Sequence, residues 1–336
     1  MIKVGVIGYG YWGPNLVRNF MEAPGSTVVS VCDLRAERLG LVRKRYPSVK
    51  TTNNPQELFA DATIDAIVIA SPVSTHFELA STALRAGKHV LVEKPLAANS
   101  EQGKRLIEEA LRRKRTLMVD HTFVYTGAVR KIRELIATNT LGDIYYYDAV
   151  RVNLGLFQHD VNVIWDLAIH DLSIMDYVLP SQAQAVSATG ISNIPGQPEN
   201  VAYITLFFST PQIAHVHVNW LTPVKVRHTL IGGSDKMILY DDLEPSEKVK
   251  IYDKGVTLSQ NGEALYELLV SYRSGDMWAP RLDTTEALQR ETLHFIDCVE
   301  QQKQPVTDGL AGLRLVNMVE AAERSLRARG ELVEIA

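Results

Sequence analysis

The chain has 336 residues, of which 46% are hydrophobic and 22% are charged, and this length favours about two globular domains. Its formal charge of −4 lacks the basic excess that nucleic-acid binding requires, so a nucleic-acid partner is not expected. The sequence has no run of about 18 apolar residues and no signal-peptide pattern at its start, so we expect neither membrane insertion nor secretion. The two cysteines, Cys32 and Cys298, are too few for a disulfide framework and are expected to be buried in a cytoplasmic protein.

The first 120 residues alternate short apolar runs with longer amphipathic stretches. Strands of a parallel sheet are buried on both faces, so such runs indicate strands that are joined by helices. We predict strands at residues 3–7, 27–32, 66–70, 89–92 and 117–119, and helices at residues 14–22, 36–46, 76–85 and 100–113. This order predicts an α/β domain with a doubly wound parallel sheet, the Rossmann architecture, over residues 1–120.

The pattern changes after residue 120. Helices are predicted at residues 127–137, 166–178, 284–300 and 309–329, and β-rich runs such as 201–208 and 213–218 lie within residues 183–240. Residues 241–280 are the least regular part and are expected to contain a hairpin. Residues 121–336 therefore predict an α+β domain on a mostly antiparallel sheet, whose last helices can pack back on the first domain.

A glycine-rich turn follows the first predicted strand. The segment GYGYWG places Gly8, Gly10 and Gly13 in the GxGxxG spacing, directly before a predicted helix. Glycine allows the tight turn at the first position, close approach to a pyrophosphate at the second and close helix packing at the third. The N–H groups and positive dipole end of the helix stabilise the anion. The turn predicts dinucleotide binding, with a purely structural turn as the alternative.

Asp33 ends the second predicted strand, about where a carboxylate that binds the adenine ribose is expected. A carboxylate there pairs with a free 2′-hydroxyl and repels a 2′-phosphate, so NAD is favoured over NADP. Arg35 and Arg38 keep NADP as an alternative, because either can face a 2′-phosphate. A solvated start of a helix is the simpler interpretation of both arginines.

Two further loops follow predicted strands, which is where ligands of an open α/β sheet bind. The first has the sequence SPVSTHF and contains Ser71, Pro72, Thr75 and His76, which also suit a turn and a helix cap. The second contains the triplet EKP at residues 93–95. Because the proline restricts the local backbone, Lys94 can place its ammonium over the nicotinamide edge, although a single loop lysine is usually solvated.

These segments together resemble the glucose–fructose oxidoreductase, inositol dehydrogenase and MocA family. The resemblance extends over nearly the whole chain and includes the glycine turn, SPVSTH, EKP and a D-x-x-x-H pair after residue 160. It implies an N-terminal Rossmann domain and a second domain, residues 121–336, for substrate binding and oligomerisation. The outer face of the open sheet in that second domain is implied to form homodimers or homotetramers.

The D-x-x-x-H pair consists of Asp166 and His170 in the segment WDLAIHD. Four residues apart on a helix, they share one face, and a carboxylate one turn from an imidazole can orient a general base. A helix cap or surface pair is the alternative that the residues alone leave open. The resemblance implies that both are catalytic together with Lys94. The family's usual Gly and Asp in this motif are replaced here by Ala168 and Ser173, and Asp171 follows the histidine directly.

The segment WDLAIHD and the opening GYWGPNLVRNF resemble a branch of the family that acts on nucleotide sugars. This implies NAD-dependent oxidation of a ring hydroxyl, at C3, of a sugar such as UDP-N-acetylglucosamine or its uronate. His170 would take the hydroxyl proton, Lys94 would stabilise the oxygen, and hydride would pass to C4 of the nicotinamide. No metal is expected. The alternatives are an inositol or free-sugar dehydrogenase and a catalytically silent NAD-binding regulator.

Further polar and loop residues complete the expected site. The residues expected at the cofactor are Gly8, Gly10, Tyr11, Trp12, Gly13, Asp33, Leu34, Arg35, Ser71, Pro72, Thr75, His76, Glu93, Lys94 and His121. The residues expected at the substrate are Lys94, Tyr125, Arg151, Asn153, Gln158, Asn162, Asp166 and His170. A packed tyrosine and a buried histidine are equally good interpretations of Tyr125 and His121. His215 and His217 alternate along a predicted strand and are interpreted as residues of a sheet face.

Overall fold

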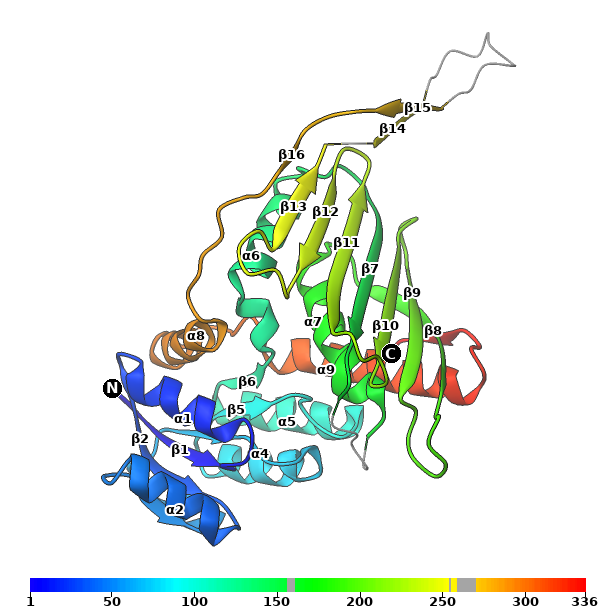
Figure 1. Ribbon diagram of the computed structural model, residues 1–336. Helices are drawn as coiled ribbons and strands as arrows, with labels where there is room; N and C mark the ends of the chain where they lie inside the picture. The colour runs from blue at the N-terminus through cyan, green and yellow to red at the C-terminus, as the bar shows by residue number, and fades with distance from the viewer. Residues whose placement is uncertain (156–160, 254, 259–269) are drawn as a thin grey trace. The chain divides into compact units, whose positions relative to one another are not determined.

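A computed structural model describes residues 1–155, 161–253, 255–258 and 270–336 (Figure 1). Contacts divide the chain into two compact units. The first unit contains Met1–Tyr125 and Thr285–Glu320, and the second contains Thr126–Thr284 and Ala321–Ala336. The boundary after Tyr125 thus falls close to residue 120, and the segment Thr285–Glu320 belongs to the first unit again. No helix among the described residues is long and apolar enough to span a membrane.

The first unit is a parallel sheet with the strand order β3-β2-β1-β4-β5-β6. Its strands are β1 (Ile2–Ile7), β2 (Ser26–Cys32), β3 (Lys50–Thr52), β4 (Ala66–Ile69), β5 (His89–Glu93) and β6 (Leu117–Asp120). The predicted Rossmann architecture is confirmed, and this order reverses between β1 and β4, where such sheets bind ligands. The prediction missed β3 and the helix after it, because both are too short to show a period.

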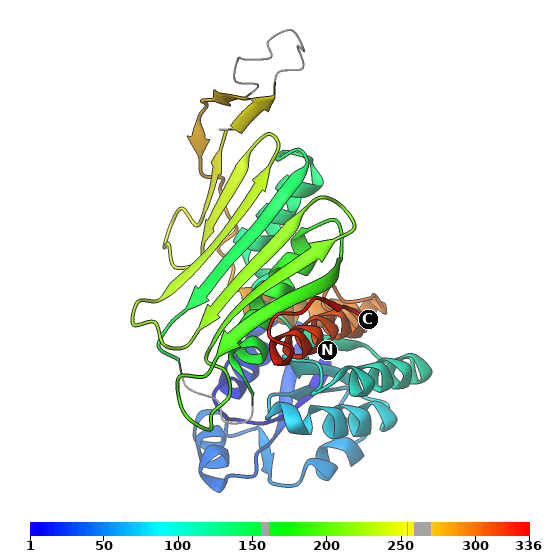
Figure 2. The ribbon, with the colours of Figure 1, turned by 90° about the vertical axis from the view of Figure 1, so that its right-hand side faces the viewer.

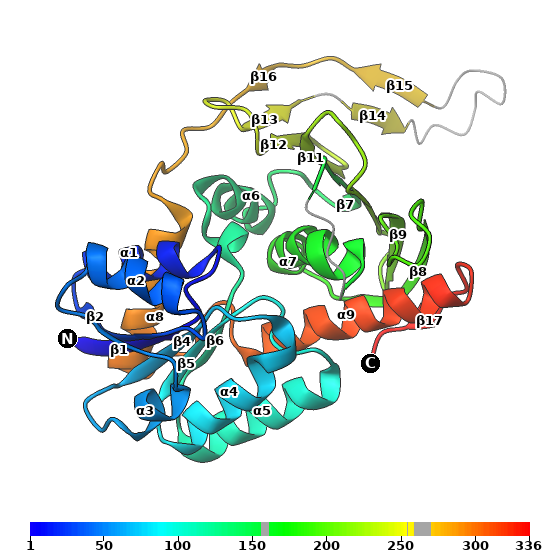
Figure 3. The same ribbon diagram turned by 60° about the horizontal axis from the view of Figure 1, so that its bottom comes forward.

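Helices cover both faces of this sheet, as Figure 3 shows. They are α1 (Gly13–Glu22), α2 (Ala36–Arg45), α3 (Pro55–Ala60), α4 (His76–Arg85), α5 (Ser100–Arg113), α8 (Ala287–Gln301) and the first part of α9 (Gly309–Arg327), with short turns η1 (Val73–Thr75) and η2 (Thr122–Tyr125). Helices α4 and α5 pack together on one face and α1 and α8 on the other. The rings of Phe20 and Phe295 meet edge to face at 6.0 Å, which explains why residues 285–320 belong to this unit.

The described part of the second unit is built on a nine-stranded sheet with the order β16-β13-β12-β11-β7-β10-β9-β8-β17. Its strands are β7 (Ile144–Val152), β8 (Ala183–Ile191), β9 (Val201–Phe208), β10 (Ile213–Asn219), β11 (Val226–Gly233), β12 (Met237–Asp241), β13 (Val249–Tyr252), β16 (Met277–Trp278) and β17 (Val333–Glu334). Strands β7 and β10 are parallel, and the other described pairs are antiparallel, so the predicted mostly antiparallel sheet is confirmed.

Two helical segments, α6 (Gly127–Ala137) and α7 (Ile169–Val178), lie on one face of this sheet. Figure 2 shows the other face, over which no described helix of this unit runs. Within residues 241–280, β14 (Gly255–Leu258) pairs with β15 (Val270–Arg273) in antiparallel fashion, as the hairpin prediction required.

The predicted helix at residues 166–178 needs a correction. The segment begins instead with a π-helical turn, η3 (Ile164–Ala168), and becomes α-helical only at Ile169. A π turn contains an extra residue per hydrogen-bonded ring, so it shifts Asp166 relative to the faces of α7. Such turns are frequent at functional sites, and the apolar period of a single sequence does not reveal them.

Candidate functional site

The glycine turn connects β1 to α1, and each glycine has a separate steric reason. Gly8 has a φ of +98°, and a Cβ there would come within 2.4 Å of the Ala70 carbonyl oxygen. A Cβ at Gly13 would come within 2.1 Å of the Gly8 carbonyl oxygen. At Gly10, by contrast, a Cβ would meet among the described residues only the tip of Arg35, at 3.4 Å. The turn is therefore tightly packed at Gly8 and Gly13 and has space beside Gly10. This space fits the close approach of a dinucleotide phosphate.

Asp33 lies at the end of β2, where its carboxylate fixes the shape of the turn. Its Oδ2 accepts a hydrogen bond from the Tyr9 N–H at 2.7 Å, and its Oδ1 accepts from the Arg35 N–H at 2.9 Å and Nε at 3.3 Å. Burial raises the pKa of Asp33, but the N–H groups of Arg35 and Tyr9 outweigh burial and lower it below its ordinary value. Asp33 is therefore an anion at neutral pH. Tyr11 and Leu34 are almost fully exposed nearby in sequence.

His76 supports the loops after β4 and β5 from inside the unit. Its ring is buried, with Nδ1 2.8 Å from the Pro95 carbonyl oxygen and Nε2 2.9 Å from the Ser71 carbonyl oxygen. Both ring nitrogens of His76, which was expected at the cofactor, thus lie against backbone carbonyl oxygens. Ser71 and Thr75 share a hydrogen bond between their hydroxyl groups at 2.7 Å on the exposed side of this loop.

Lys94 is half-buried in the loop after β5, where the carbonyl oxygen of Pro95 contacts the His76 ring. Its positive charge acts on His121, which follows β6 and is 2% exposed. Burial and then the Lys94 charge lower the pKa of His121 to about 3, so its ring is neutral. Neither ring nitrogen has a hydrogen-bond partner among the described residues. Tyr125 is buried, and its hydroxyl lies 3.0 Å from that of Thr307 inside the same unit.

Asp166 and His170 lie at the junction of η3 and α7, and both are half-buried. The Asp166 Oδ2 accepts a hydrogen bond from the indole Nε1 of Trp220 at 3.0 Å. Trp220 follows β10 and is 1% exposed, so it holds the carboxylate from a rigid position. The sequence prediction missed this residue, because Trp220 lies 54 positions from Asp166 and has no motif of its own.

Asn162 caps the π turn. Its Oδ1 accepts hydrogen bonds from the N–H groups of Ile164 at 3.1 Å and Trp165 at 3.3 Å. This is the ordinary role of an asparagine before a helix, and it engages the Oδ1 of a residue that was expected at the substrate. Asn153 is half-buried just beyond β7, and Gln158 lies outside the described residues.

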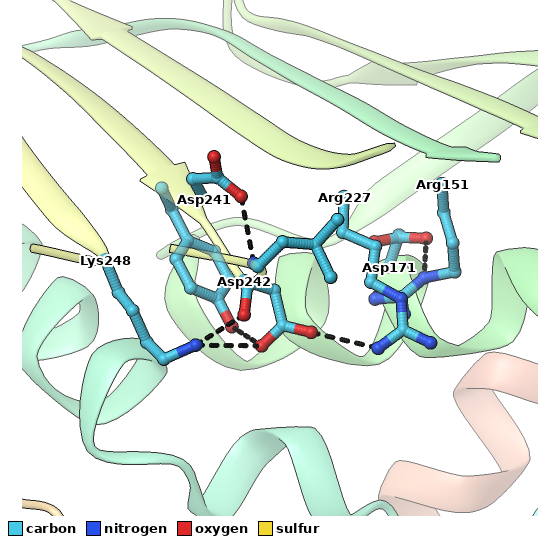
Figure 4. Close-up of polar contacts among 8 residues, drawn as sticks. Arg151, Asp171, Arg227, Asp241, Asp242 and Lys248 are labelled. Carbon is cyan, nitrogen blue, oxygen red and sulfur yellow. Dashed lines mark hydrogen bonds and ion pairs between the residues drawn. The ribbon is translucent and has the colours of Figure 1, made fainter. Parts of the chain in front are cut away.

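Arg151 forms a buried ion pair with Asp171, the residue after His170 (Figure 4). Its Nε and Nη2 donate to the two carboxylate oxygens at 2.7 and 3.0 Å, and each side chain is 3% exposed. The hydroxyl of Tyr147 donates to the Asp171 carbonyl oxygen at 3.1 Å. Arg151 was expected at the substrate, but the structure uses its guanidinium to tie α7 to β7.

A second ion pair extends this network across the sheet, as Figure 4 shows. Arg227 on β11 donates to Asp242 Oδ2 at 3.0 Å, and the Tyr240 hydroxyl donates to Asp242 Oδ1 at 3.0 Å. Hydrogen bonds from Arg227 and Tyr240 outweigh the effect of burial and lower the pKa of Asp242. The helix that carries His170 is therefore backed by two ion pairs, Arg151–Asp171 and Arg227–Asp242.

Comparison with known proteins finds two family profiles in the chain. A profile described as an oxidoreductase family with an NAD-binding Rossmann fold matches residues 2–121. A profile described as the GFO/IDH/MocA C-terminal domain matches residues 129–239. The two matches fall on the two units, and the first contains the glycine turn, Asp33 and Lys94.

Relatives and solved structures extend over the whole chain. UDP-N-acetylglucosamine 3-dehydrogenase of Acidithiobacillus ferrooxidans is 27% identical over 94% of this chain and 94% of its own length. Myo-inositol 2-dehydrogenase of Thermotoga maritima is 24% identical over 98% of this chain and 97% of its own. A levoglucosan dehydrogenase in complex with NADH and levoglucosan has a similar fold, with a TM-score of 0.84 at 17% identity over 100% of this chain and 99% of that one.

Proposed function

Because the chain belongs to the GFO/IDH/MocA family of NAD-binding oxidoreductases, we propose that it oxidises a ring secondary hydroxyl, at C3, of a nucleotide-linked sugar such as UDP-N-acetylglucosamine or its uronate. The observation that carries this proposal is the pair of Asp166 and His170 on the η3–α7 junction, with Asp166 held by Trp220. The relative from A. ferrooxidans, aligned over almost the whole chain, supports the substrate class.

In this proposal each polar side chain has one task. His170 takes the proton of the hydroxyl group, and Asp166 orients His170 and a neighbouring sugar hydroxyl. Lys94 donates a hydrogen bond to the reacting oxygen and stabilises negative charge as it develops there. Bound NAD would supply the hydride acceptor. The open backbone at Gly10 and the anionic Asp33 would bind this cofactor.

An inositol or free-sugar dehydrogenase is the second candidate. The T. maritima relative named for myo-inositol aligns over 98% of this chain and supports it. Both candidates share the same oxidation of a ring hydroxyl, so the distinction is one of substrate. A nucleotide-linked substrate requires groups for a diphosphate, whereas an inositol requires hydroxyl partners only.

The proposal is tested by mixing the protein with NAD and a panel of UDP-sugars, free sugars and inositols while following the absorbance of reduced nicotinamide. A 2-oxo acid is included to recycle any cofactor that stays bound. Turnover with a UDP-N-acetylhexosamine and slower turnover with inositols is the expected result. Reduction with inositols alone would replace the substrate assignment, and no reduction with any compound would contradict the reaction.

We further infer that the chain forms a homodimer or homotetramer in the cytoplasm. The uncovered sheet face in Figure 2 supports the assembly, because large apolar side chains on its strands are exposed, among them Tyr146, Tyr203, Phe207 and Ile213. Cys32 and Cys298 are both free and buried, which fits a reducing compartment. Light scattering of the purified protein checks the assembly, and a monomer would contradict it.

A further inference from the structure

The loop between β8 and β9 ends at two residues that bind the segments on either side of Asp166. The Glu199 carbonyl oxygen accepts a hydrogen bond from the Val163 N–H at 3.0 Å. Val163 directly precedes the π turn that contains Asp166. The next carbonyl oxygen along the chain, that of Asn200, accepts from the Trp220 N–H at 2.9 Å. One short segment of the loop therefore fixes both the start of η3 and the residue whose indole binds the Asp166 carboxylate.

Asp166 is joined to this segment through its side chain and through its backbone. Its Oδ2 accepts from the Trp220 indole at 3.0 Å, and its N–H donates to the Asn162 carbonyl oxygen at 3.2 Å. Since residues 162–163 and 199–200 are neighbours in the chain, these hydrogen bonds close into a ring. The members of the ring are Asp166, Trp220, Asn200, Glu199, Val163 and Asn162.

The ring lies in the interior of the second unit. Asn200 is 0% exposed and Asn162 is 6% exposed, and Val163 and Trp220 are likewise buried. Water cannot replace a hydrogen bond that is lost at such positions, so each bond of the ring is costly to break. The Asp166 carboxylate is therefore restricted at both of its points of attachment.

The side chain of Asn162 adds a further link between the π turn and the loop. Its Oδ1 caps the turn, and its Nδ2 donates to the Glu199 Oε2 at 3.4 Å. A cap requires only the oxygen, and serine or aspartate supplies one equally well. The cap alone therefore does not explain the amide nitrogen, whereas a link to Glu199 uses it.

We propose that Asn162, Glu199 and Asn200 position the Asp166 carboxylate for its task beside His170. All three are positioning residues, because they act on the reaction through Asp166. The effect on turnover rests on the proposed function, whereas the ring itself can be tested without any substrate.

The ring is tested by hydrogen exchange of the indole N–H groups, followed by magnetic resonance with isotopically labelled tryptophan. The chain has four tryptophans, and Trp220→Phe identifies the signal of Trp220 by its loss. Asn162→Ser keeps a capping oxygen and removes the amide donor. It should speed exchange at the Trp220 indole about threefold or more, because the bond to Asp166 opens more often. The Trp12 indole, which donates to Asp120 in the first unit, should exchange at an unchanged rate.

The effect on turnover is measured with the sugar that the unaltered protein oxidises fastest. Asn162→Ser should lower kcat about three- to fivefold and keep KM within about twofold, since the groups that bind substrate are intact. Glu199→Ala should have the same effect, whereas Glu199→Gln keeps an oxygen for the amide and should stay within about twofold. The Asn162→Ser/Glu199→Ala double variant should be no slower than either single variant.

Asn54→Ala is the matched control for loss of an asparagine cap. Asn54 accepts from the Gln56 N–H at 3.1 Å at the start of α3, so its loss should lower the melting temperature. It should leave kcat and exchange at the Trp220 indole unchanged.

Three results would overturn the proposal. They are unchanged indole exchange at Trp220 in both Asn162→Ser and Glu199→Ala, additive losses in the double variant, and a raised KM with unaltered kcat in Asn162→Ser, which would show that Asn162 binds substrate. If the unaltered protein oxidises no sugar, the proposed function fails, and the indole exchange still decides whether the ring holds Asp166.

Discussion

In the first unit the candidate nucleotide site is made by the backbone, and in the second unit the candidate catalytic site is made by side chains. Gly8 and Gly13 leave no space for a Cβ, so the path of the chain itself forms the turn. Asp166 depends instead on Trp220, and the helix of His170 depends on the Arg151–Asp171 pair. The first kind of site follows from residues close in sequence, and the second requires residues that only the fold brings together.

We expect the largest effect on turnover from removal of the polar groups proposed for catalysis. Lys94→Ala and His170→Ala should each lower turnover by about two to four orders of magnitude, because each removes a proton-transfer or charge-stabilising group. NAD affinity should change little, since the backbone turn is intact. Steady-state kinetics and NAD titration check both statements, with the exposed Lys104→Ala on α5 as the control that keeps turnover. Unaltered turnover in either variant would remove that residue from the mechanism.

The next effect tests whether Arg151 supports α7 or binds substrate. Arg151→Met leaves Asp171 charged and buried without its partner, which should cost about 3 to 5 kcal/mol in the free energy of unfolding. The Arg151→Met/Asp171→Leu double variant should recover most of this, because it removes both charges. Urea unfolding measures both. A stable Arg151→Met protein with a raised KM would show instead that Arg151 binds substrate.

A pair of alanine substitutions separates the two functions of the glycine turn. Gly8→Ala should lower stability by at least about 1 to 2 kcal/mol, because alanine is strained at a φ of +98°. Gly10→Ala should change stability by about 0.5 kcal/mol or less, yet weaken NAD by about tenfold or more, because its methyl group occupies the open side of the turn. Thermal unfolding and NAD titration of both check this. Equal stability losses in the two variants would be the contrary result.

The smallest effect is expected at Trp220. Trp220→Phe removes the hydrogen bond to Asp166 and should lower kcat about five- to tenfold with little change in KM. The same substitution in an Asp166→Asn background should add little, since the two residues act as one unit. Independent losses in the double variant would mean that Trp220 acts by packing and does not position Asp166.

Sequence reasoning predicted the parts of the molecule that depend on local pattern. The Rossmann sheet, the glycine turn and the place of Asp33 directly after β2 followed from spacing, because strand burial and turn geometry each require particular residues at fixed intervals. The mostly antiparallel sheet of the second unit followed from its short β-rich runs. The sequence prediction missed β3 and α3 because they are only three and six residues long.

The remaining features depend on contacts between distant segments. Nothing near Arg151 in sequence indicates that its guanidinium pairs with Asp171, 20 residues later. The inward position of His76 likewise depends on the carbonyl of Pro95, which the loop after β5 supplies. The π turn at Ile164–Ala168 changes the helix geometry without changing the apolar pattern, so the predicted helix had the wrong start.

The most direct test of the proposed reaction uses UDP-N-acetylglucosamine that carries deuterium at C3. We predict that NAD is reduced with transfer of that deuterium, so that mass spectrometry finds the reduced nicotinamide one mass unit heavier. His170→Ala should slow this transfer by about two to four orders of magnitude. Reduction of NAD without deuterium from C3 would contradict the assigned carbon. If neither this sugar nor its uronate reduces NAD, the nucleotide-sugar assignment is wrong.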